Sequence, residues 1–203
     1  MIIKHAISLR DAGRASLAYF YFDFRDKDKK QDFRNLVTSL LVQLSTSLNP
    51  CSDPCCEIIS RIYSTHETGR QQPSDDALKN CLRQMLLVSA QLPIYIIIDA
   101  LDECPNAGMP SPREEVLNLL EDLARSRLPN LHICVTSRLE VDIKQTLEQL
   151  PHSTVSLHEE SGQQNDIYNY LSGAIETDRK MWSWRAEEKK LVVTELSTKA
   201  DGM

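Results

Sequence analysis

The strongest constraint on the fold is a run of five apolar residues, 94–98, that ends directly in Asp99. Strands that face solvent on one side alternate apolar and polar residues, whereas strands that are buried on both faces are apolar throughout. Sheets with both faces covered are typically parallel sheets with helices on each side. The run therefore predicts an interior parallel strand of an α/β domain.

The rest of the chain alternates between short apolar segments and amphipathic segments. Further strands are predicted over residues 17–24, 131–135 and 154–157, which are short and rich in aromatic or branched side chains. Apolar residues at steps of three and four predict the helices. These helices cover residues 2–12, 33–48, 55–66, 74–86, 113–126, 140–149, 166–175 and 187–199. The predicted fold class is α/β, a doubly wound and mostly parallel sheet with flanking helices.

Acidic residues follow the strand 94–98 at its carboxyl end, where open α/β sheets bind their ligands. Asp99 is a candidate magnesium ligand, because Mg²⁺ takes one or two carboxylates and keeps several waters and phosphate oxygens. Asp102 and Glu103 are candidate catalytic acids that orient or deprotonate an attacking water. Many β/α proteins end a strand in an acid, so these residues alone leave a purely structural role open.

A second polar group follows the strand 131–135. Thr136 and Ser137 supply a pair of hydroxyls, and Arg138 supplies a guanidinium. Such a group at a strand end can contact the terminal phosphate of a nucleotide. Arg138 alone fits a surface ion pair, but its combination with the acids at 99–103 favours a nucleotide site.

A phosphate-binding loop is missing from the sequence. It requires Gly-x-x-x-x-Gly-Lys-Ser/Thr between a strand and a helix. The six glycines stand at positions 13, 69, 108, 162, 173 and 202, and none precedes a lysine. The backbone cradle and the lysine that hold the phosphates in such sites are therefore absent from this sequence.

Charge and composition bear on the class of partner. The net charge is −6 and the basic residues are dispersed, which argues against a nucleic-acid surface. No apolar run approaches the roughly 20 residues of a membrane span, and no signal peptide is evident. The six cysteines lack the spacing of a zinc site and favour reduced thiols in a cytoplasmic protein.

The two strand-end motifs resemble those of the NACHT domain, in the nephrocystin-like form common in large fungal proteins of the signalling P-loop NTPase class. The resemblance covers nearly the whole chain and rests on Asp-Ala-Leu-Asp-Glu-Cys at 99–104 and Thr-Ser-Arg at 136–138. It implies that Asp99 is the Walker B magnesium acid and that Asp102 and Glu103 lie near the attacking water. It also implies that Thr136, Ser137 and Arg138 form sensor 1, although Leu139 replaces the proline usual in the family.

The same resemblance implies a domain organisation and cofactors. Residues 1–160 correspond to an incomplete NACHT core without its first strand and Walker A loop, and residues 161–203 begin a C-terminal helical region. Mg²⁺ and ATP or GTP are the implied cofactors. The implied partners are other protein domains or chains, including further copies, because the missing strand would leave unpaired edges on the strands 131–135 and 154–157.

Three functions are open at this stage. The first is a truncated or degenerate NACHT module of a larger signalling or scaffold protein, with little or no ATP hydrolysis by itself. The second is a working NTPase switch whose Walker A loop is supplied from outside this chain. The third is a nucleotide-independent interaction module in which the acids at 99–103 serve as cap and loop residues. Enzymatic activity is therefore uncertain, and activity of the isolated chain is not expected.

Overall fold

The structure is a computed structural model, and it describes residues 2–23, 25, 31–46, 54–65, 71–88, 92–151, 153–155 and 161–200. The chain divides into two compact units, Met1–His152 and Ser153–Met203. Each unit is described by itself below.

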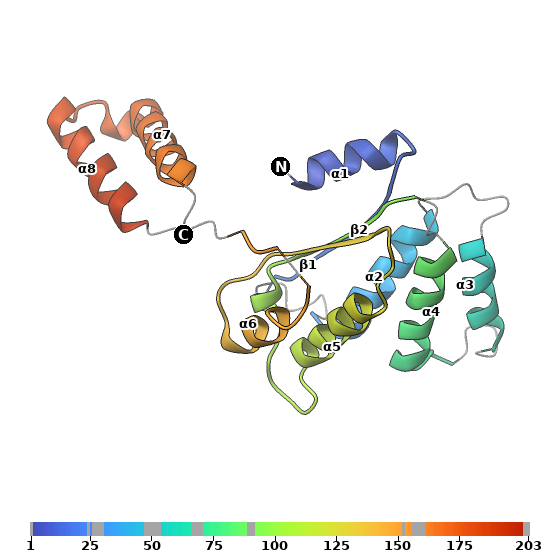
Figure 1. The fold of residues 1–203 in the computed structure, drawn as a ribbon. Coiled ribbons are helices and arrows are strands. Elements are labelled where there is room, and N and C mark those ends of the chain that lie inside the picture. Colours follow the sequence, from blue (N-terminus) through green and yellow to red (C-terminus); the bar gives the residue numbers. More distant parts are fainter. Residues whose placement is uncertain are drawn as a thin grey trace. The chain divides into compact units, whose positions relative to one another are not determined.

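The first unit is built on a parallel sheet of three strands in the order β1-β2-β3 (Figure 1). These strands are β1 (Ser16–Tyr21), β2 (Ile94–Asp99) and β3 (Leu131–Val135). Strand β2 lies in the centre, and its isoleucines are buried on both faces of the sheet. The prediction of an interior parallel strand at 94–98 is confirmed. The strand predicted over residues 17–24 ends earlier, at Tyr21.

Helices cover both faces of this sheet. Helices α2 (Phe33–Thr46), α3 (Pro54–Thr65) and α4 (Asp75–Val88) connect β1 to β2, and α5 (Pro112–Arg125) connects β2 to β3. Both connections advance across the sheet in the same direction, so right-handed crossovers place their helices on the same face. Helix α6 (Val141–Leu147) follows β3 and contributes Ile143 to this core. Helix α1 (Ile2–Asp11) covers the opposite face (Figure 1).

The main core lies between the sheet and the helices that follow β1. Buried side chains recur every three or four residues along α2, α4 and α5, as the sequence predicts. Among the described side chains of helix α3, Cys55 and Ile58 are the buried ones, and Tyr63 is 56% exposed. The apolar residues of this helix therefore do not all face the core, since Tyr63 lies on its solvent side. Helix α3 packs against α2 and α4 through a narrow stripe, so the rest of its surface faces solvent.

Side chains cap part of the outer edge of β1. The side-chain amide of Gln43 on α2 accepts a hydrogen bond from the Tyr19 N–H at 3.1 Å and donates one to the Tyr19 C=O at 2.7 Å. Just beyond the strand, the side chain of Gln31 accepts a hydrogen bond from the Asp23 N–H at 3.2 Å. These contacts satisfy backbone groups that an edge strand otherwise presents to solvent or to another chain.

The outer edge of β3 has no strand beside it within the described ranges. The Asn130 C=O and the Thr136 N–H both bond to β2, so the even-numbered residues of this segment face β2. In a strand, the backbone groups of alternate residues point to opposite sides, so those of Ile133 and Val135 point away from β2. The fourth strand expected over 154–157 is not seen at Thr154 or Val155, and Val155 is 70% exposed. Residues 156 and 157 lie outside the described residues.

The second unit is a pair of helices, α7 (Ser161–Thr177) and α8 (Ala186–Lys199), which pack against each other. A short 3-10 helix, η3 (Arg179–Met181), lies between them. The Trp182 indole N–H donates to the Glu176 C=O at the end of α7 at 3.3 Å. Nowhere in the described chain is there a helix with the length and apolar character needed to cross a membrane.

Candidate functional site

The acidic segment after β2 is shaped by an unusual backbone conformation. Ala100 adopts φ 56° and ψ 49°, the left-handed region, and the chain then forms the 3-10 helix η2 (Leu101–Glu103). A non-glycine residue in this region costs about 1–2 kcal/mol. The turn places Leu101 in the core with none of its surface exposed. The side chains of Asp99 and Asp102, on either side of Leu101, remain at the carboxyl edge of the sheet.

Thr136 joins the end of β3 to the end of β2. Its hydroxyl donates a hydrogen bond to the Asp99 carboxylate and accepts one from the Ala100 N–H at 3.0 Å. The Thr136 C=O accepts a further hydrogen bond from the Leu101 N–H at 3.0 Å. Because a carboxylate can only accept, the hydroxyl proton of Thr136 is directed to Asp99, and the hydroxyl oxygen remains free to accept from the Ala100 N–H. Thr136 thereby fixes the orientation of the proposed magnesium acid.

Asp102 and Arg138 are bound to each other. The Arg138 N–H donates to the Asp102 Oδ1 at 3.1 Å, and the Arg138 Nε lies 3.5 Å from the Asp102 Oδ2. The Asp102 side chain is 10% exposed, whereas that of Arg138 is 82% exposed. Arg138 therefore holds Asp102 through its backbone, while most of its side chain lies in solvent.

The structure brings together four of the six residues expected at this site. These are Asp99, Asp102, Thr136 and Arg138. Ser137 is exposed, and its hydroxyl donates to the neighbouring Arg138 C=O at 2.7 Å, which is a local contact. Glu103 ends η2 and is half-buried, with its N–H bonded to the Ala100 C=O at 2.9 Å.

The charge of Asp99 affects the pKa of side chains on both neighbouring strands. Burial raises the pKa of the Tyr21 hydroxyl, and the charges of Tyr19 and Asp99 raise that pKa further. Burial likewise raises the pKa of the Cys134 thiol, with the Asp99 carboxylate as the second cause. Both groups resist acquiring a negative charge beside an existing one. Asp99 therefore lies close enough to both neighbouring strands to act on the ionisation of Tyr21 and Cys134.

The acids fit a magnesium ion only in part. The described residues contain no group of three or more His, Cys, Asp or Glu side chains that could hold a metal ion by themselves. A magnesium ion that keeps its waters and takes phosphate oxygens needs only one or two carboxylates, and the partly exposed Asp99 suits that role. The sequence supplies no glycine loop for the phosphates. The residues therefore fit the metal side of a nucleotide site and do not supply its phosphate cradle.

Comparison with protein families decides the relationship. The model of the family described as nephrocystin 3, N-terminal, matches residues 1–138, which is more than half of the chain and includes both strand-end motifs. The chain belongs to the nephrocystin 3 N-terminal family. Neither the curated proteins nor the solved structures contain a match to it.

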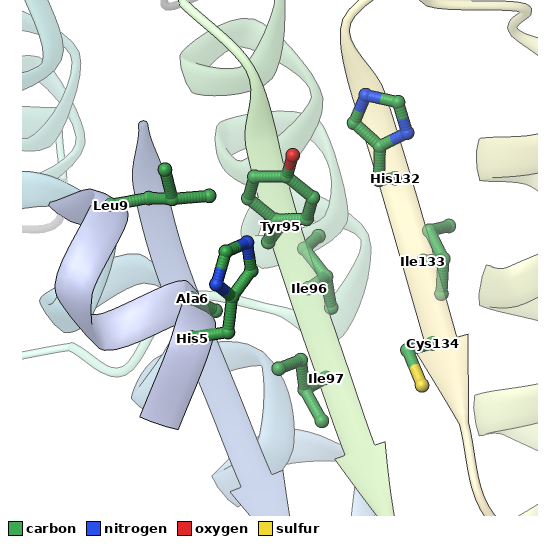
Figure 2. A pocket seen from close by; sticks show the side chains of 9 residues that line it. All are labelled: His5, Ala6, Leu9, Tyr95, Ile96, Ile97, His132, Ile133 and Cys134. Atoms are coloured by element: carbon green, nitrogen blue, oxygen red, sulfur yellow. The ribbon is translucent and has the colours of Figure 1, made fainter. Parts of the chain in front are cut away.

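The nephrocystin 3 N-terminal chain also has a hollow on the α1 face of its sheet, with a volume of about 220 Å³. Figure 2 shows His5, Ala6 and Leu9 of α1 on one side of this hollow and residues of β2 and β3 on the other. The rings of Tyr95 and His132 stack there, with centroids 5.0 Å apart. None of the acids at 99–103 lines this hollow, so it is separate from the acidic edge.

Two residues of this nephrocystin 3 N-terminal chain were overlooked as contributors to the site. Leu101 anchors the acidic segment in the core, and the isolated leucine between two acids is the sequence signal for it. Arg113 is 8% exposed and bonds to the backbone of the acidic segment. Its charge suggests a solvent-facing helix residue, so no local pattern reveals its role.

Proposed function

We propose that this chain is a NACHT-type nucleotide-responsive module of a larger signalling or scaffold protein, with little or no ATP hydrolysis by itself. The observation that carries the proposal is the meeting of Asp99, Asp102, Thr136 and Arg138 at the carboxyl edge of β2 and β3. This is the edge at which open α/β sheets bind their ligands.

Each residue has a role in this proposal that follows from its contacts. Asp99, oriented by the Thr136 hydroxyl, binds a hydrated magnesium ion, and that ion would neutralise phosphate charge when bound. The exposed guanidinium of Arg138 reaches the terminal phosphate of ATP or GTP. Asp102 and Glu103 are, in this proposal, the acids near the attacking water.

The contacts of Asp102 also support the expectation of weak hydrolysis. A general base must be within reach of the proton that it removes. In this structure the Asp102 carboxylate accepts the Arg138 N–H and pairs with the Arg138 guanidinium. Together with the missing glycine loop, this arrangement favours a module that senses a nucleotide over one that hydrolyses it alone.

Calorimetric titration of the monomeric chain with ATP in Mg²⁺ tests this function. We expect binding weaker than micromolar, because no cradle holds the phosphates. Asp99→Asn should weaken the magnesium-dependent binding by about tenfold, since a ligand to the metal is lost. The control is Asp122→Asn, which removes an exposed carboxylate of α5 and should leave the affinity unchanged.

Two results would contradict the proposal. Micromolar or tighter ATP binding by the monomeric chain would favour the working NTPase switch. Binding that is independent of both Mg²⁺ and Asp99, or no binding even at millimolar ATP, would remove the nucleotide role.

The edge of β3, which has no strand beside it in the described part of the chain, favours a second candidate, a nucleotide-independent interaction module. Gln43 caps the outward backbone groups of Tyr19 on β1, whereas Ile133 and Val135 direct their backbone groups away from β2. The five residues of β3 carry no Lys, Glu, Asp or Pro, the residues with which edge strands commonly block pairing. Such an edge favours association with another chain, including a second copy.

Sedimentation of the chain over a range of concentrations tests this second candidate. We expect the wild type to associate, and we expect His132→Lys to remain monomeric because a lysine on an edge strand disfavours edge-to-edge pairing. Loss of the stacking on Tyr95 should cost only about 0.5–1.5 kcal/mol.

His5→Lys is the matched control for this experiment. It makes the same substitution in the same hollow, but on α1 and away from the edge of the sheet. This variant should associate like the wild type. A wild type that is monomeric at hundreds of micromolar, or a His132→Lys variant that associates normally, would contradict the prediction.

A further inference from the structure

Arg113 is a buried cation that the proposed function does not use. It is the second residue of α5, and its residue surface is 8% exposed. A buried guanidinium is costly unless its N–H groups find acceptors. The identity of those acceptors therefore indicates what Arg113 does.

The acceptors belong to two segments on either side of the site. The Arg113 Nη2 donates to the Asp102 C=O at 2.5 Å, and its Nε donates to the Cys104 C=O at 3.1 Å. Both carbonyls belong to the acidic segment that follows β2. The Arg113 Nη1 lies 3.3 Å from the Oδ2 of Asp142, which is on α6. Helix α6 directly follows the segment that carries Thr136 and Arg138.

Asp102 is consequently held from both ends by arginines. Arg113 holds its backbone carbonyl, and Arg138 holds its carboxylate. If the backbone of Asp102 moved, its carboxylate would lose its hydrogen bond with the Arg138 N–H. The guanidinium of Arg113 thus helps to set the distance between the acidic segment and the segment after β3, which are the two halves of the candidate site.

Neighbouring side chains hold the Asp142 end of this contact. The Asn106 side-chain amide donates to the Asp142 Oδ2 at 3.2 Å. Ser111, the N-cap of α5, donates from its hydroxyl to the Asn106 side-chain oxygen at 3.0 Å. The carboxylate that receives Arg113 is therefore itself oriented by the loop before α5.

We propose that Arg113 is a positioning residue that sets the geometry of Asp102 and Arg138, and that couples the acidic segment to α6 through Asp142. The coupling itself stands on the contacts above. Its consequence for nucleotide binding rests on the proposed function.

Lysine cannot replace arginine in this role. The guanidinium is planar and presents five N–H donors in a fixed fork, which here reach two carbonyls and one carboxylate. The lysine ammonium is a point charge on a flexible stem. Arg113→Lys therefore preserves the charge but removes the simultaneous hydrogen bonds to the two segments.

Amide hydrogen exchange measured by NMR tests the coupling without any nucleotide. In Arg113→Lys we expect the amides of Leu101, Glu103, Cys104 and Arg138 to exchange about tenfold faster, as befits the loss of a hydrogen bond to a charged group. The Tyr19 amide on β1 should change little and serves as the internal reference. Asp142→Asn tests the same contact at a half-exposed position, should Arg113→Lys fold poorly.

Arg125→Lys is the matched control. It makes the same substitution in the last turn of α5, where Arg125 is exposed and forms an ion pair with Glu121. This variant should leave all these exchange rates unchanged. Because Arg113 and Asp142 act as one unit, the double variant Arg113→Lys/Asp142→Asn should exchange no faster than the faster single variant.

Wild-type exchange at these four amides in Arg113→Lys would overturn the proposal. Equal acceleration at the Tyr19 amide would also overturn it, because that pattern reports a general loss of stability. In a parallel titration with ATP and Mg²⁺, Arg113→Lys should bind about tenfold more weakly than the wild type. If the wild type binds no ATP, the proposed function fails, and the exchange rates still decide the role of Arg113.

Discussion

Replacing Leu101 by alanine is expected to lower the free energy of unfolding by about 2–5 kcal/mol, the usual cost of truncating a buried leucine. Leu101 has no exposed surface and belongs to the main core, although it lies between two acids of the candidate site. Domains of this kind are stable by only about 5–15 kcal/mol, so this one leucine accounts for a large share. Urea denaturation followed by circular dichroism measures the change.

Leu139→Ala is the matched control for this experiment. Leu139 is 81% exposed in the segment after β3, so the same substitution there should change the stability by no more than about 0.5 kcal/mol. If Leu101→Ala were as mild as Leu139→Ala, the acidic segment would not be anchored in the core as the structure shows.

The thiol of Cys104 is expected to be almost inert in the folded protein. Burial raises the pKa of Cys104 to about 12, and the nearby Arg113 offsets only part of this rise. The thiolate is the reactive form, so at pH 8 a shift from 9 to about 12 lowers its population on the order of a thousandfold. Iodoacetamide labelling, read by peptide mass spectrometry, should be slower by that factor in the folded chain than in urea.

Cys81 provides the comparison within the same experiment. Burial raises its pKa to about 11, so its labelling should slow on the order of a hundredfold. Rapid labelling of Cys104 in the folded chain at pH 8 would contradict its burial beside η2.

The same two thiols predict that stability falls in alkali. Above pH 9 they ionise in the unfolded chain but remain protonated in the folded chain until their raised pKa values are reached. The unfolded state therefore releases protons first and is favoured as the pH rises. For each thiol, the free energy of unfolding should fall by up to about 1.4 kcal/mol per pH unit between pH 9 and 11. Cys104→Ala should reduce this slope, whereas a slope that is flat or positive in the wild type would contradict the prediction.

Much of the fold follows from local pattern. The apolar run at 94–98 is buried on both faces because β2 lies between two strands and two layers of helices. The carboxyl ends of adjacent parallel strands lie at one edge, so Asp99 and Thr136 meet there as expected. The local sequence pattern does not show at which residue a strand ends. Phe22 is buried like a strand residue, but β1 ends before it.

The residues that were missed act over long separations. Gln43 closes the edge of β1 from 24 positions away, and Arg113 reaches Asp142 over 29 positions. A glutamine or arginine in an amphipathic helix has the same local signature whether it faces water or a backbone group. The pairing of Asp102 with Arg138 was also unexpected, because each was assigned to a ligand and their mutual distance depends on the tertiary fold.

The capped Tyr19 backbone makes the two edges of the sheet unequal. Because Gln43 caps the Tyr19 backbone, regular pairing of a further strand is less favourable at β1 than at β3. A strand added there in parallel would end next to Thr136 and Arg138, since parallel neighbours share their carboxyl edge. A strand paired with β3 and a ligand bound at the acidic edge would then be neighbours, so the binding of one could affect the binding of the other.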